Sequence, residues 1–238
     1  MMRKTFLLPL LLLLLTSACE LPDPREDVDC NALLNVETDR TTALANGLDQ
    51  IRISVTLDDE IRPEAQVTFS TDYGSFAGSG DRTELTVTPV AGKAEARLRT
   101  TREIRESATV FVRVEDYCET SVDIATLPAY PDLITLESDR STITANRSEA
   151  ANLTVSLFRE AGKGAVSDDI RIDFKTETTD GSDAEADVVD FAFVENETAS
   201  VSLRSATDST GVITVTACVE GADGTTLSDS RTIELVGF

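Results

Sequence analysis

The sequence predicts an all-β protein, built as two tandem antiparallel β-sandwiches that follow a signal peptide. Apolar and polar residues alternate over segments of about seven residues, as they do in half-buried strands. These segments occur twice along the chain, at a spacing of about 100 residues. A short apolar run at the start of the chain predicts the signal peptide.

The leader has the parts of a bacterial lipoprotein signal. Two basic residues precede an apolar run of ten residues, Phe6 to Leu15, which is too short to span a bilayer. Small residues then lead to Cys19, and this ending resembles the lipobox of bacterial lipoproteins, whose cysteine carries the lipid. The resemblance implies a signal peptide over residues 1–18, lipidation of Cys19 and a tether over residues 19–29. The alternative is a plain signal peptide with an incidental cysteine.

The residue after the cysteine and the overall charge bear on location and partners. Lipoproteins held in the inner membrane often carry aspartate after the cysteine, so Glu20 favours the outer membrane over the inner one. The mature chain would keep 43 acidic residues and 19 of the 21 basic ones, a net charge of −24. Such a charge disfavours nucleic acid and anionic lipid surfaces as partners. We therefore expect a bacterial envelope protein held to its membrane by the lipid anchor, with no nucleic-acid partner.

The interior of the chain contains two copies of one sequence pattern. Residues 36–47 align without a gap on residues 136–147, and six of the twelve positions are identical. Other segments align in the same order, 51–57 with 151–157, 67–71 with 172–176, 94–100 with 199–205 and 108–114 with 211–217. This period is far longer than that of a solenoid repeat, so it predicts a duplicated domain.

The aligned segments are the predicted strands of the two domains, which we place at residues 30–127 and 132–238. Each domain is expected to have about seven short strands separated by turn signals, and no helical stretch is expected outside the leader. The linker over residues 128–131 contains two prolines, which restrict the backbone and make it short and stiff.

The first domain resembles a known family. The pattern consists of Ala45-Asn-Gly47, a strand, the segment Val67 to Gly74, and Ala91-Gly-Lys-Ala94 before another strand. It is similar to the bacterial immunoglobulin-like domains of invasin and intimin type. The second domain departs from the pattern, because Arg147 replaces the glycine and an acidic insertion spans residues 178–190. The resemblance implies immunoglobulin-like sandwiches and an adhesive role.

The cysteines after the leader suggest one disulfide. Cys30 precedes the first strand, and Cys118 falls near the start of the last strand of the same domain. First and last strands of immunoglobulin-like sandwiches often run parallel as neighbours, so the resemblance implies that these two cysteines lie close. The envelope permits a Cys30–Cys118 bridge, and two unrelated thiols are the alternative. Cys218 alternates with the apolar residues of its strand, so it is expected on the outward face, unpaired.

The composition argues against catalysis and against a cofactor. The chain has no histidine, which removes the usual nucleophile systems and zinc sites. Without tryptophan and with three tyrosines, it lacks the aromatic platforms of sugar sites, and Tyr73 beside Gly74 is expected in a turn. The acidic residues 178–190 offer oxygen ligands for calcium but lack EF-hand spacing, so a solvated loop is preferred and no metal is expected.

These observations favour a non-catalytic lipoprotein that presents its domains as a structural or adhesive module, with another protein as its partner and no small-molecule substrate. The first alternative is a periplasmic scaffold or accessory lipoprotein of an envelope complex. A weaker alternative is a glycan-active enzyme that uses a pair of carboxylates.

Overall fold

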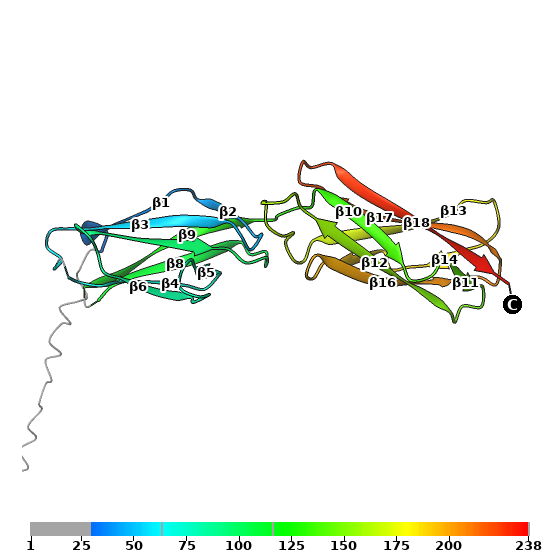
Figure 1. Cartoon of the computed structure of the whole chain (residues 1–238), viewed down its shortest axis with the longest axis horizontal. Coiled ribbons are helices and arrows are strands. Elements are labelled where there is room, and N and C mark those ends of the chain that lie inside the picture. The colour runs from blue at the N-terminus through cyan, green and yellow to red at the C-terminus, as the bar shows by residue number, and fades with distance from the viewer. Residues whose placement is uncertain (1–29, 63, 116, 238) are drawn as a thin grey trace, which may run out of the picture.

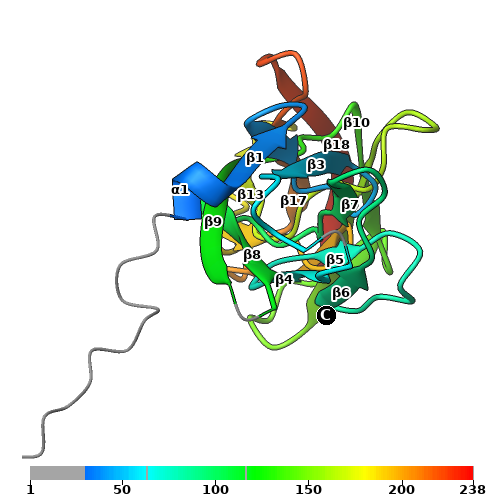
Figure 2. The same ribbon diagram turned by 90° about the vertical axis from the view of Figure 1, so that its left-hand side faces the viewer.

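The structure, a computed structural model, describes residues 30–62, 64–115 and 117–237. Within these ranges the strands form four sheets, which pair into two β-sandwiches. Figure 1 shows the sandwiches end to end along the long axis of the molecule, and Figure 2 looks along that axis. The signal peptide, Cys19 and the tether lie outside the described residues. None of the described helices is long and apolar enough to cross a membrane.

The first sandwich begins with one helical turn, α1 (Cys30–Leu33), which the sequence did not predict. One sheet has the strand order β1-β3-β7-β5, and the sheet that faces it has the order β2-β9-β8-β4-β6. The strands are β1 (Leu34–Thr38), β2 (Thr42–Leu44), β3 (Gln50–Leu57), β4 (Val67–Thr71), β5 (Ser75–Phe76), β6 (Glu84–Val87), β7 (Lys93–Arg99), β8 (Ser107–Val114) and β9 (Cys118–Leu127).

The second sandwich repeats this plan with nine added to each strand number. Its sheets have the orders β10-β12-β16-β14 and β11-β18-β17-β13-β15. The strands are β10 (Leu133–Ser138), β11 (Thr142–Thr144), β12 (Ala150–Phe158), β13 (Arg171–Thr178), β14 (Ala186–Asp187), β15 (Phe191–Phe193), β16 (Thr198–Ser205), β17 (Gly211–Glu220) and β18 (Thr226–Val236). The repeat in the sequence is thus a repeat in topology. The acidic insertion adds no strand, because β14 within it and β15 after it correspond to β5 and β6 of the first sandwich.

Each sandwich has nine strands rather than about seven, because short edge strands are present and the first strand is split. β1 pairs antiparallel with β3, whereas β2 crosses to the other sheet and pairs parallel with β9. The prediction that the whole first strand neighbours the last one is therefore wrong for β1 and correct for β2. The chain changes sheets at residues 39–41, where the polar run Asp-Arg-Thr interrupts the alternation.

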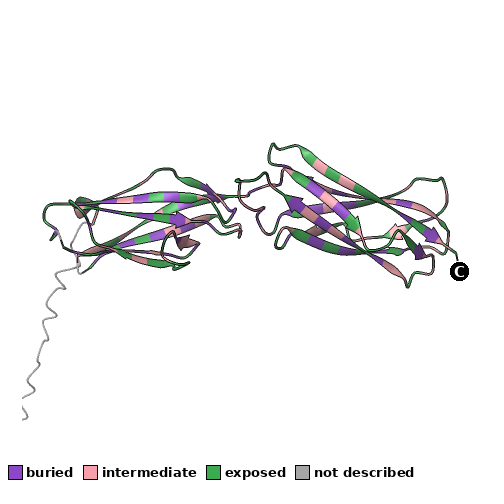
Figure 3. Cartoon of the chain, viewed as in Figure 1, coloured by how far each residue is buried: buried purple, intermediate pink, exposed green. Residues whose placement is uncertain are grey.

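The core of each sandwich comes from the inward residues of the alternating strands. Along β3, Ile51, Ile53 and Val55 are at most 1% exposed, while the residues between them face outward. Figure 3 shows this alternation as bands of buried and exposed residues along the strands. Tyr73 is also a core residue, 2% exposed, and its hydroxyl donates to the carbonyl of Glu103 at 2.9 Å. Tyr73 lies in the turn between β4 and β5, as predicted, and its side chain points inward from that turn.

Candidate interaction site at the joint between the sandwiches

The joint is built around one turn of the first sandwich, residues 44–49, which we call the joint turn. The side-chain oxygen of Asn46 accepts hydrogen bonds from the amides of Leu48 at 2.9 Å and Asp49 at 2.7 Å. An asparagine that bonds to amides two and three residues ahead fixes its own turn. Asp49 in turn accepts from the amide of Leu44 at 2.9 Å and pairs with Arg40. The turn is therefore set by its own side chains.

One loop of the second sandwich, residues 163–168, closes on this turn, and we call it the joint loop. The side-chain amide of Asn46 donates to the backbone carbonyl of Lys163 at 2.9 Å. The backbone amide of Ala165 donates to the backbone carbonyl of Asn46 at 2.9 Å. Ser167 is fully buried, and its hydroxyl donates to the carbonyl of Ala45 at 2.5 Å. These three bonds join the two sandwiches largely through backbone groups.

The linker is part of the joint. The amide of Ala129 donates to the Ser167 hydroxyl at 2.8 Å, and the carbonyl of Ala129 accepts from the Ser167 amide at 3.1 Å. Ala129 is 1% exposed, and Tyr130 packs against the second core. Pro131 also takes part, since its carbonyl accepts from the amide of Ala222 at 2.8 Å. The predicted stiffness of this segment thus comes from tertiary bonds as well as from its prolines.

Gly164 allows the joint loop to approach closely. Its φ of +70 to +80° lies in the left-handed region, and a Cβ there would lie 2.8 Å from the carbonyl oxygen of Asn46. Real Cβ atoms do not come that near to a backbone oxygen. Gly162, two residues earlier, also has a positive φ but would meet nothing within 4 Å. The close packing of the joint therefore depends on a glycine at position 164.

A second contact lies on the other side of the joint. Arg102 bonds to the side chain of Asn196 and lies 3.9 Å from a carboxylate oxygen of Asp168. The amide of Asp168 donates to the carbonyl of Arg102 at 2.9 Å. Ile104 packs against the core of the second sandwich. Arg102 and Ile104 thus add side-chain contacts between the two sandwiches to the backbone bonds of the joint.

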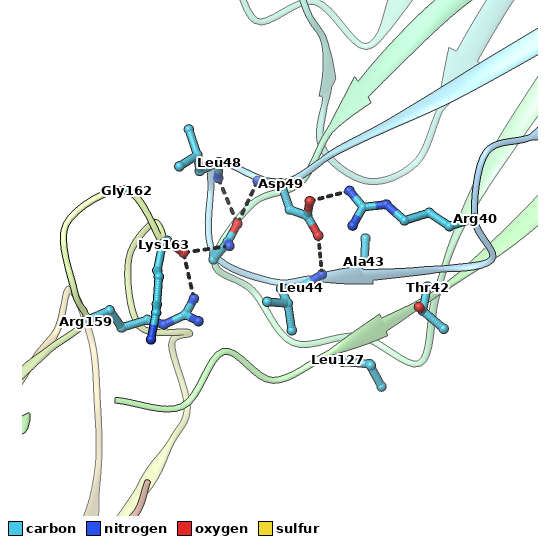
Figure 4. Close-up of a pocket in the computed structure, with 11 residues that line it drawn as sticks. Arg40, Thr42, Ala43, Leu44, Leu48, Asp49, Leu127, Arg159, Gly162 and Lys163 are labelled. Carbon is cyan, nitrogen blue, oxygen red and sulfur yellow. Dashed lines mark hydrogen bonds and ion pairs between the residues drawn. The ribbon is translucent and has the colours of Figure 1, made fainter. Parts of the chain in front are cut away.

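A cleft of about 550 Å³ opens beside the joint turn, with walls from both sandwiches. Figure 4 shows the guanidinium of Arg159 and the backbone carbonyl of Lys163 near the turn of the first sandwich, while the side chain of Lys163 extends away from that turn. The side chains of Leu48 and Leu127, which are 49% and 46% exposed, also line the cleft. The cleft therefore combines apolar surface with positive charge in an acidic protein.

The structure brings Cys30 and Cys118 together. α1 packs against β9, which places the two thiols next to each other. Burial, together with the neighbouring Cys30 thiol, raises the pKa of the Cys118 thiol to about 12. Both residues are free thiols here, so the disulfide stays a prediction. Their proximity comes from α1, which carries Cys30 to the start of β9, and not from parallel pairing of β1.

Cys218 and the acidic loop lie apart from the joint. Cys218 is half-buried on β17, between the buried Ala217 and Val219, so its side chain takes the outward face. In the acidic loop, Asp180 accepts from the amides of Ser182 at 3.1 Å and Val212 at 2.9 Å. The hydroxyl of Ser182 also donates to Asp180, at 2.6 Å, and this bond lowers the pKa of Asp180 most, followed by the bond from the Ser182 amide. Among the described residues, no group of three or more acidic or cysteine side chains is placed to hold a metal ion.

Sequence reasoning missed the joint and the cleft. The joint loop is irregular, and its partner turn lies 117 residues away in the sequence. One signal was present in the sequence: the Ala-Asn dipeptide occurs in both copies of the repeat, within residues 36–47 and 136–147. This dipeptide marks the turn but does not indicate which surface covers it.

The fold is shared with solved bacterial adhesins. The structure of the adhesin InvE of Yersinia pseudotuberculosis is 19% identical, with a TM-score of 0.57, over 85% of this chain and 58% of that one. The structure of invasin, described as a bacterial integrin-binding protein, is 24% identical, with a TM-score of 0.58, over 86% of this chain and 39% of that one.

This chain thus spans 58% of the InvE chain and 39% of the invasin chain in those structures. No family model matches the sequence, and no curated protein matches it. The resemblance inferred from the sequence is confirmed at the level of fold: the two immunoglobulin-like β-sandwiches share the fold of the InvE and invasin structures.

Proposed function

We propose that this protein is a non-catalytic lipoprotein of the bacterial envelope that holds a stiff rod of two immunoglobulin-like domains away from its membrane and presents it to a protein partner. The observation that carries the proposal is the joint. Backbone hydrogen bonds, a buried serine and a close-packed glycine couple the sandwiches, as suits a spacer that keeps a distal surface at a fixed distance.

Several features support the individual parts of the proposal. The ending at Cys19 resembles a lipobox, which supports the lipid anchor. The similarity to InvE, an adhesin, and to invasin, an integrin-binding protein, supports a protein partner and an envelope location. The absence of histidine from the sequence supports a role without catalysis.

The test has two arms in cells that make the full-length protein. Wild type should partition into detergent with the membranes, and Cys19→Ser should move to the soluble fraction, while Cys218→Ser serves as the matched control. Protease added to intact cells should then cleave the wild-type rod. Unchanged partitioning of the Cys19 variant would contradict the lipid anchor. Full protection from protease would contradict surface display and favour the periplasmic scaffold.

A further inference from the structure

Arg159, directly after β12, has an unusual setting at the joint. One terminal nitrogen of its guanidinium donates to the carbonyl of Lys163 at 2.8 Å. Its Nε is buried and has no hydrogen-bond acceptor, the one such side-chain atom among the residues that the structure describes. A buried donor without an acceptor destabilises the protein, and more so when the group is charged. An acceptor that displaced the atoms now covering Nε would recover that loss.

The charges around the cleft leave Arg159 as its available cation. Arg40, Arg159 and Lys163 line the cleft together with one carboxylate, that of Asp49. Arg40 pairs with Asp49, and Lys163 pairs with Asp132 at 3.1 Å and Glu160 at 3.0 Å. Within the described ranges, no carboxylate lies within ion-pair distance of Arg159, although the chain has 43 acidic residues. Arg159 thus carries the one positive charge among the residues that line the cleft which no ion pair neutralises.

The guanidinium edge that remains is suited to a carboxylate. With one terminal nitrogen bonded to Lys163, the edge formed by Nε and the other terminal nitrogen remains, and two carboxylate oxygens match that edge. Leu48 and Leu127 provide half-exposed apolar surface on the same cleft, from the first sandwich. The net charge of the protein opposes a ligand with many negative charges.

We infer that the cleft binds an acidic segment of a partner protein, in which one aspartate or glutamate side chain pairs with Arg159 and a neighbouring apolar side chain packs on Leu48 and Leu127. This inference rests on the proposed function, since it assigns a surface and a chemistry to the protein partner. Because the walls come from both sandwiches, the site exists only while the joint is closed.

The experiment follows the Nε–H signal of Arg159 by NMR in the mature full chain, assigned by its absence from Arg159→Gln. The probes are acetyl-Leu-Asp-Leu-amide, acetyl-Leu-Asn-Leu-amide and sodium acetate. The aspartate peptide should shift the signal to saturation and bind about tenfold more tightly than the asparagine peptide, because a charge-assisted bond is lost in the latter. Acetate should bind more weakly than the aspartate peptide, because it has no apolar neighbour.

Variants on both walls make the test specific. Arg159→Gln should abolish the preference for the aspartate peptide, and Arg204→Gln, an exposed arginine elsewhere, should keep it. Leu48→Ser, at an exposed position, should weaken binding of the aspartate peptide but not binding of acetate. No saturation, equal binding of the two peptides, equal binding of acetate, or full binding by Arg159→Gln would each overturn the inference. Membrane partition and protease access would be unaffected by those results, so the proposed function can fail or stand separately.

Discussion

The two copies of the Ala-Asn turn differ in their surroundings and not in their own geometry. In the second sandwich, Asn146 accepts from the amides of Ser148 at 2.9 Å and Glu149 at 3.0 Å, as Asn46 does in the first. Glu149 takes the place of Asp49 and pairs with Arg140 at 2.6 Å. Yet Asn46 is 6% exposed under the joint loop, whereas Asn146 is partly exposed at the far end of the rod. The local sequence therefore makes the turn, and the neighbouring loop makes it a joint.

The surfaces beside the two turns differ as well. The first sandwich has Arg102 beside its turn, where it bonds to Asn196, and the aligned position in the second sandwich is Thr207. The first sandwich also has the neighbouring thiols Cys30 and Cys118, whereas Cys218 of the second is half-buried on the outward face. A few side chains thus distinguish the first sandwich from the second.

The largest expected difference between the sandwiches comes from the cysteines. Protein from an oxidising compartment should contain the Cys30–Cys118 bridge, which would stabilise the first sandwich by about 4 kcal/mol in the chain-entropy model. Reduction should lower the unfolding transition of that sandwich and leave the other in place, as measured by calorimetry. Cys218→Ser is the control. A digest without the Cys30–Cys118 peptide would show that the two thiols stay apart in the cell.

Gly164→Val should open the joint. The new side chain meets the backbone of Asn46, so we expect a loss of about 2 kcal/mol beyond the cost of Gly162→Val, which shares the positive φ but has open space. Small-angle scattering should show a broader spread of interdomain distances for Gly164→Val alone. If both variants scatter as the wild type does, close approach at position 164 is not what holds the rod straight.

The two asparagines allow the joint bond to be measured by difference. Asn46→Ala and Asn146→Ala both remove the bonds to the turn amides, but only Asn46→Ala also removes the bond to Lys163. The first variant should therefore lose about 1 kcal/mol more in free energy of unfolding. Denaturant unfolding of the full chain provides the comparison. Equal losses would mean that the bond to Lys163 adds nothing to the turn.

The smallest effect concerns the ionisation of Glu149. Hydrogen bonds from Thr144, together with the positive charge of Arg140, hold the pKa of Glu149 below its ordinary value of 4.5. A carboxyl with a lowered pKa stabilises the fold above its unfolded pKa, and this contribution is lost as the pH falls through the folded pKa. The amide signal of Thr144 should therefore titrate below pH 4.5. Glu149→Gln should remove that transition, and its persistence would point to another group.

The sequence predicted the strands well because alternation and duplication are local or repeated signals. The segments 51–57 and 108–114 are strands with the expected inward residues, and both sheets of each sandwich follow from the immunoglobulin-like plan. The split between β1 and β2 was missed, because a polar run of three residues is also what a simple turn would show.

The site was less predictable than the fold. The bonds of Asn46 to the joint loop depend on the path of a loop between β12 and β13, which has no periodic pattern. The orphaned nitrogen of Arg159 depends on burial, which one arginine among many does not reveal in a sequence. The turn position of Tyr73 was predicted but the burial of its side chain was not, since the direction of a side chain in a loop is set by the space that the core leaves for it.

The parallel pairing of β2 with β9 also has a mechanical consequence. A protein held at its N-terminal end and pulled at its far end transmits tension into β2 from one side and out through β9 on the other. Because these strands run parallel, the tension slides them past each other and loads the bonds between them together instead of opening them one at a time. The same arrangement recurs in β11 and β18. Each sandwich should therefore resist a pulling force along the long axis of the molecule, which is the direction in which a bound partner would pull.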